Sequence, residues 1–161
     1  MAECYSLEKL QKDYLLLKKK YELPELDRLL EDFDIDKLTE KEPLLLAREI
    51  RKVVSEKITS YLALFEHFKN PSSCPMFIFS ALKNASDELK KIVEEAYTEI
   101  AKIELISLKL DTIYNEKDEA EFIKKVYTQW QGLKKKIYFL LKELESNIDK
   151  SDTANKTSYF G

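Results

Sequence analysis

The chain has 161 residues, of which 44% are hydrophobic and 35% charged, and its formal net charge is −3. This length is enough for one domain with a buried core. The only glycines, Gly132 and Gly161, cannot supply a glycine-rich phosphate loop. One histidine and two distant cysteines, Cys4 and Cys74, exclude a zinc finger and a disulfide framework, so we expect a cytoplasmic protein with reduced thiols and no cofactor.

Apolar residues recur at spacings of three and four along most of the chain, which indicates amphipathic helices. The first predicted helix covers 6–21 and ends before Pro24, and a short acidic helix follows within 25–36. One long helix is predicted over 43–69. No apolar run approaches the roughly 20 residues of a membrane span, so none is expected.

The second half of the chain repeats this pattern. Pro75 precedes a short predicted helix over 76–84, and two long helices are predicted over 86–113 and 118–148. No segment alternates with a period of two, so no strand is expected. The predicted fold is therefore all-α: an elongated up-and-down helical bundle of about four main helices with short connecting helices.

Short connections between long helices favour antiparallel neighbours with coiled-coil packing. We predict one helical-bundle domain over 1–149. The remaining residues, 150–161, are polar until Tyr159 and are predicted to form a C-terminal tail.

Four glutamates raise the question of a magnesium site. Glu95 and Glu99 share one helix face, and so do Glu116 and Glu119. A carboxylate-bound magnesium hydrolase needs acidic pairs that face inward from two helices. These residues fall on the polar sides of their helices, so solvated faces paired with lysines are the favoured interpretation and the hydrolase is the least favoured alternative. We expect no catalytic and no metal-binding residue, and the pattern indicates no small-molecule substrate.

A basic run in the last helix suggests a second alternative. Lys134, Lys135 and Lys136 follow Trp130, and Trp130, Lys134 and Tyr138 lie on one helix face. A nucleic-acid-associated accessory protein would use this strip to contact phosphates and stack on bases. Because the chain is acidic overall, the favoured interpretation is that Trp130 belongs to the core and the lysine stems cover it.

The segment 74–82 carries no charge and contains Met76, Phe77, Ile78 and Phe79. A helix that is apolar on all sides must be buried on all sides. The segment therefore either folds deeply across the mouth of the bundle or leaves an exposed patch that contacts a partner.

The acidic helix 25–36 is the other candidate contact. The range 23–43 contains eight acidic and three basic residues. Leu26, Leu29, Leu30 and Phe33 share one side of the predicted helix. The part from Leu26 to Phe33 resembles the leucine-aspartate motif of paxillin-type adaptors, with Phe33 where that motif prefers leucine. The resemblance implies docking of this helix on a helical-bundle partner; alternatively, the helix packs on its own bundle with its charges outward.

The leading hypothesis is a non-catalytic interaction or scaffold protein. It would bind a protein partner, or a second copy of itself, through 74–82, through 25–36, or through both.

Overall fold

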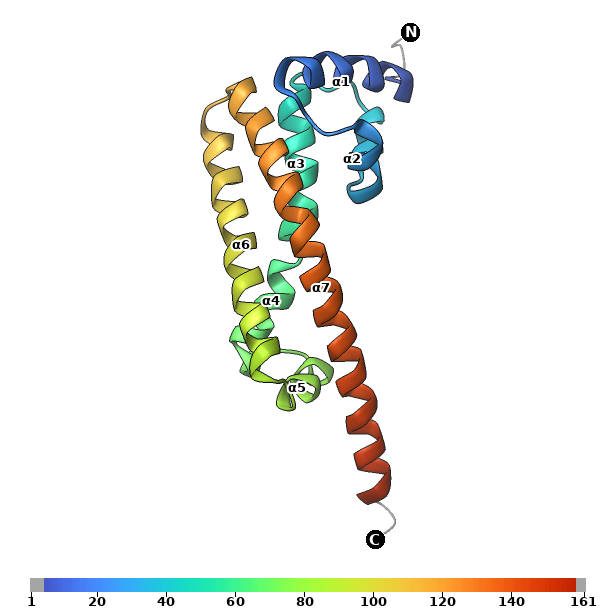
Figure 1. The fold of residues 1–161 in the computed structure, drawn as a ribbon, viewed down its shortest axis with the longest axis vertical. Helices are drawn as coiled ribbons and strands as arrows, with labels where there is room; N and C mark the ends of the chain where they lie inside the picture. Colours follow the sequence, from blue (N-terminus) through green and yellow to red (C-terminus); the bar gives the residue numbers. More distant parts are fainter. Residues whose placement is uncertain (1–4, 159–161) are drawn as a thin grey trace. The chain divides into compact units, whose positions relative to one another are not determined.

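The computed structural model describes the backbone of residues 5–158 and the side chains of residues 5–150 (Figure 1). This part of the chain is built from helices and contains no strand, which confirms the all-α fold. None of its helices has a stretch long and apolar enough to span a bilayer. The elements in chain order are α1 (Leu7–Tyr21), α2 (Leu26–Asp32), the 3-10 helix η1 (Ile35–Thr39), α3 (Leu46–Thr59), α4 (Leu62–Lys69), the 3-10 helix η2 (Pro71–Ser73), α5 (Met76–Lys83), α6 (Asp87–Thr112) and α7 (Glu116–Ser158).

Contacts within the chain divide it into two compact units. Unit 1 comprises Met1–Ser60 and Lys102–Trp130, and unit 2 comprises Tyr61–Ala101 and Gln131–Gly161. Both α6 and α7 therefore contribute residues to each unit. The arrangement as one four-helix bundle, the single domain over 1–149 and the coiled-coil packing stay predictions.

Side-chain caps determine where three of the helices begin. The Ser6 hydroxyl accepts a hydrogen bond from the Lys9 amide (3.2 Å) at the start of α1, as the sequence predicts. At α6 the Ser86 hydroxyl accepts from the Leu89 amide (3.1 Å). The Asn115 side chain accepts from two amides of the first turn of α7. These bonds satisfy amides that have no partner within the helix.

The prediction of one helix over 43–69 is wrong, because the chain turns between α3 and α4. The hydroxyl of Ser60 donates to the Lys57 carbonyl (2.7 Å), and that of Thr59 donates to the Glu56 carbonyl (3.5 Å). Such hydroxyls compete with the helical bonding pattern of the backbone. The apolar periodicity continues across the turn, so the sequence pattern by itself does not indicate the interruption.

At the other end, α7 continues to Ser158, past the end predicted at about Ile148. No glycine or proline occurs between Gly132 and Gly161 to interrupt the helix. The predicted tail, 150–161, lies partly outside the described residues: the side chains of 151–158 and the whole of 159–161 are not described.

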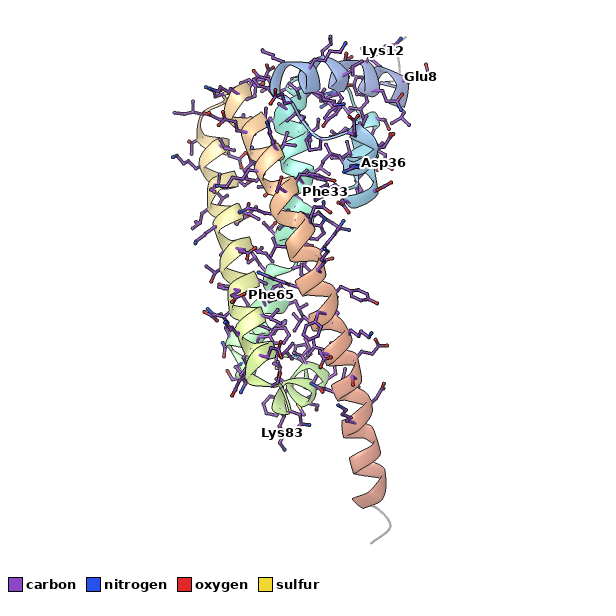
Figure 2. The ribbon with its side chains drawn as sticks, viewed as in Figure 1. Glu8, Lys12, Phe33, Asp36, Phe65 and Lys83 are labelled. Atoms are coloured by element: carbon purple, nitrogen blue, oxygen red, sulfur yellow. The ribbon has the colours of Figure 1, made fainter. Side chains whose placement is uncertain are left out.

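The cores of both units follow the apolar stripes. Phe33 and Phe65 are labelled in Figure 2, and each points into the interior of its own unit. In α7 one row of buried positions alternates at spacings of four and three, as expected for a helix that packs along one face, and Ala120 and Phe122 are buried beside this row. The positions of the row are Glu119, Ile123, Val126, Trp130, Leu133, Ile137, Leu140, Leu144 and Asn147.

Candidate functional site

The charge-free segment folds as the helix α5, as predicted. Its first turn forms because the amides of Ile78 and Phe79 both donate to the Pro75 carbonyl (3.0 Å each). Proline suits this position, because its own missing amide costs nothing at a helix start. Ile78 and Ala81, three residues apart on one face, are buried in unit 2.

The opposite face of α5 carries large apolar side chains in solvent. The exposed fractions of Met76, Phe77 and Phe79 are 75%, 60% and 45%. Because these residues are one and three positions apart at about 100° per residue, Phe77 and Phe79 project to either side of Met76. We call these three side chains the α5 surface. Of the two arrangements open to this segment, the structure has the partly exposed one; Ile78, also a candidate contact residue, is part of the core.

The inner side of α5 is held by a specific polar contact. The side-chain amide of Asn147, on α7, donates to the Ala81 carbonyl (3.1 Å) in a buried position. Satisfying this carbonyl near the end of the helix stabilises the docking of α5, since an unpaired buried carbonyl is costly. The α5 surface is therefore displayed by a helix that is anchored from behind.

A mainly apolar pocket of about 400 Å³ lies next to the end of α5 in unit 2. Lys69, on its rim, makes an ion pair with Glu94 (2.9 Å) and lies 4.4 Å from the ring centroid of Tyr97. The pocket adds apolar area near the C-terminal end of α5. Its lining residues are Phe68, Lys69, Pro71, Leu82, Ala85, Leu89, Lys90, Val93 and Glu94.

The acidic helix packs on its own chain. Leu26, Leu29 and Phe33 are buried in unit 1, Leu30 is half-buried, and the Phe33 ring lies 5.8 Å from that of Trp130. The apolar side that a docking partner would need is therefore occupied by unit 1. This is the arrangement expected for the intramolecular alternative.

Two hydrogen-bonded contacts hold α2 and the turn before it. The buried hydroxyl of Tyr14 donates to the Pro24 carbonyl (2.6 Å), and burial raises the pKa of Tyr14. Lys18 pairs with Glu25 at the start of α2. These contacts join α1 to α2 and add to the apolar packing.

Of the two aromatic members of the basic strip in α7, Trp130 is buried in unit 1, whereas Tyr138 is exposed. In unit 2, Lys136 hydrogen-bonds Glu99 (2.8 Å) and lies 3.7 Å from Glu95, and the bond to Glu99 is the main reason that the pKa of Lys136 is raised. Lys134 is half-buried and Lys135 is exposed. Trp130 is therefore not available to stack on a base, and Tyr138 is the aromatic side chain of the strip that remains exposed.

The four glutamates considered for magnesium are engaged by basic side chains. Lys136 hydrogen-bonds Glu99 and makes an ion pair with Glu95. Glu116 accepts hydrogen bonds from Lys20 (2.7 Å) and from the hydroxyl of Tyr21 (2.9 Å). Within the described residues no three His, Cys, Asp or Glu side chains gather in a metal-binding group.

Glu119 differs from the other three, and the interpretation of it as a solvated residue is wrong. Its side chain is 0% exposed and accepts from Arg51 Nε (2.7 Å) and Arg48 Nε (3.2 Å). Arg51, 1% exposed, also donates to Ser107 Oγ (2.8 Å) and to Asp111 Oδ1 (2.5 Å). This network joins α3, α6 and α7 inside unit 1.

Sequence reasoning missed this network, although a signal was present. Arg51 is four residues after Ala47 and three before Val54, so it lies in phase with the apolar stripe of α3. Glu119 stands four residues before Ile123 in the stripe of α7. A charged residue on an apolar face is rarely buried without a partner, so an arginine and a glutamate in such positions indicate a pair.

Comparison of the chain with protein-family models, curated proteins and solved structures found no match. The chemistry of the described side chains is therefore the basis for a functional proposal. The acidic and basic groups considered above as site candidates largely bond one another, whereas the apolar groups of the α5 surface face solvent. This contrast favours binding.

Proposed function

We propose that this chain is a non-catalytic interaction protein and that the α5 surface is its contact site for a partner protein. The supporting observation is the exposure of Met76, Phe77 and Phe79 on a helix whose other face is buried and anchored. Large apolar side chains grouped in solvent are typical of protein contact sites.

The size of the α5 surface fits the centre of an interface. At about 200 Å² per side chain, the exposed fractions correspond to roughly 350 Å² of largely apolar area. A stable complex buries about 800 Å² on each partner, so polar residues around α5 would supply the remainder. A few central aromatic side chains usually provide most of the binding free energy.

The shape of α5 indicates what the partner presents. Phe77 and Phe79 diverge from Met76 around a single short helix, so the surface is convex. A flat partner could bury only one of the rings at a time. The matching surface is an apolar groove that receives the helix, which is a common mode of helix recognition.

The acidic helix does not carry the proposal, because its apolar residues are buried in unit 1. The side of this helix that faces solvent is charged, and Asp27, Glu31 and Asp36 are exposed on it.

The experiment is affinity capture with the purified, immobilised chain, using a lysate of the source organism. Wild type is compared with a Phe77→Ser/Phe79→Ser variant and with Leu16→Ser, a matched control at an exposed leucine of α1. We expect one or more proteins to be retained by wild type and by the control but not by the double variant. With the purified partner, the double variant should bind at least tenfold more weakly in a calorimetric titration.

Circular dichroism first establishes that all three proteins are folded. The proposal is overturned if the double variant, folded as wild type, retains the same proteins with the same affinity. Light scattering of the purified chain tests whether the partner is a second copy of the chain. If it is, wild type is a dimer and the Phe77→Ser/Phe79→Ser variant is a monomer.

A further inference from the structure

The part of α6 that belongs to unit 1 has an apolar face on each side. Ile103 and Ser107 are buried against the unit, as expected for the inner face. On the outer face Leu105 is 67% and Leu108 is 52% exposed. In Figure 1, α3 and α7 both lie on the same side of this part of α6, which agrees with the contacts that Arg51 makes to α6 and α7.

The outer face has the spacing of a helix-pairing seam. Leu105 and Leu108 are three residues apart, and Thr112 follows four residues later, which matches the a, d and a positions of a heptad. Ile106 and Ile113, both exposed, extend the apolar area along one flank.

Three of the four charged side chains beside this seam have no ion-pair partner among residues 5–150. Lys102 and Lys109 occupy e positions and Glu104 a g position, and none of these side chains makes an ion pair within residues 5–150. By contrast, Asp111, at the next g position, is bonded to Arg51. Three unpaired charges thus flank two exposed leucines.

Their spacing is complementary to an identical helix that runs in the same direction. In a parallel pair, a g residue faces the e residue five positions later on the other helix. Glu104 and Lys109 are five positions apart, so two copies of α6 would form two such ion pairs. In an antiparallel pair, e positions face e positions, and Lys102 and Lys109 would repel each other.

We propose that the outer face of α6, residues 102–112, binds a second copy of this chain in a parallel arrangement. The leucines pair across the two-fold axis, and Glu104 of each copy meets Lys109 of the other. The seam is only about one and a half heptads long, so the dimer is weak, with a Kd in the micromolar range or above. This surface is separate from the α5 surface, and neither proposal depends on the other.

The first test is sedimentation equilibrium of the full chain over concentrations from about 10 μM to about 1 mM. We expect the average mass to rise from the monomer value of 19.0 kDa toward twice that value. Leu105→Glu should raise the Kd at least tenfold because it places two carboxylates opposite each other in the seam. Leu16→Glu, the same change at an exposed leucine of α1, should leave the Kd unchanged.

Charge reversal tests whether the two α6 helices of the dimer run in the same direction. Glu104→Lys and Lys109→Glu should each raise the Kd by roughly tenfold, since every copy then places like charges together. The double variant Glu104→Lys/Lys109→Glu restores opposite charges and should recover the wild-type Kd. In an antiparallel dimer Glu104→Lys would instead strengthen association, by facing Asp111 of the other copy.

Cross-linking gives an independent measure. In a Cys4→Ser/Cys74→Ser background, Leu105→Cys should form a covalent dimer on oxidation, because a positions meet across a parallel two-fold axis. The proposal is overturned by a mass that stays at the monomer value throughout, or by a dimer that persists in Leu105→Glu. A dimer lost only in Phe77→Ser/Phe79→Ser would also overturn it and would assign self-association to the α5 surface.

Discussion

Arg51 Nε lies 2.7 Å from Glu119 Oε2, and both side chains are buried in unit 1. Arg51 comes from α3 and Glu119 from α7, so the pair fixes the register of two helices that are far apart in the chain. A buried charge is tolerated only where other groups complete its hydrogen bonds, and Ser107 and Asp111 of α6 do so for this arginine.

Glu119→Leu is expected to lower the free energy of unfolding by about 3–5 kcal/mol, because it leaves Arg51 buried without its main counter-ion. The double variant Arg51→Met/Glu119→Leu should lose much less than the sum of the two single variants. Urea denaturation of the four proteins provides the measurement. Glu121→Leu, an exposed acid two positions away, is the matched control and should change little. Additive losses would contradict the coupling.

Acid should destabilise the fold through two carboxyls with lowered pKa values. The hydrogen bond from Arg51 lowers the pKa of Asp111 below its ordinary 3.8, and that from Lys20 lowers the pKa of Glu116 below 4.5. Their contribution to stability is therefore present above these ordinary values and is lost as the pH falls through the lower folded values.

The urea midpoint of wild type should accordingly be nearly constant between about pH 5 and pH 7 and fall below about pH 4.5. Asp111→Asn/Glu116→Gln should lower the midpoint at neutral pH and flatten its decline in acid. An acid decline as steep as that of wild type would show that other carboxyls are responsible.

Neighbouring residues of α5 should respond very differently to the same substitution. Phe77→Asp replaces an exposed ring and should leave the free energy of unfolding within about 0.5 kcal/mol of wild type. Ile78→Asp buries a charge in unit 2 and should cost more than about 3 kcal/mol. Thermal unfolding followed by circular dichroism compares the two. Equal losses would place Phe77 in the core and remove the proposed contact site.

Trp130 is the only tryptophan, so its fluorescence reports on the packing of α2. Its burial beside Phe33 predicts blue-shifted emission and weak quenching by acrylamide. Phe33→Ala should cost about 3–5 kcal/mol and shift the emission to longer wavelength. Red-shifted emission in wild type would mean that α2 leaves unit 1 in solution, and would return this helix to consideration as a docking element.

Gly132→Ala is expected to stabilise the protein by about 0.5–1 kcal/mol. Gly132 lies within α7, and a Cβ placed on it meets no atom within 4 Å. Alanine therefore adds helix propensity without a clash. Urea denaturation measures the gain in the free energy of unfolding; a loss instead would contradict the open space around Gly132.

Local chemistry in the sequence was sufficient for the helical class, the caps at Ser6 and Ser86 and the existence of α5. Such features depend on residues within a few positions of one another, so spacing and capping rules apply directly. The same rules failed at Ser60, where two hydroxyls bond to the backbone inside a stripe that stays apolar.

The tertiary structure decided which stripes are covered. Leu29 and Leu105 both lie on apolar helix faces, yet Leu29 is buried in unit 1 and Leu105 is exposed. Nothing adjacent to either residue distinguishes them, because burial depends on whether a distant segment packs over the helix. The partnership of Arg51 with Glu119 has the same origin: each charge sits on a local stripe, but only the folded chain brings the two stripes face to face.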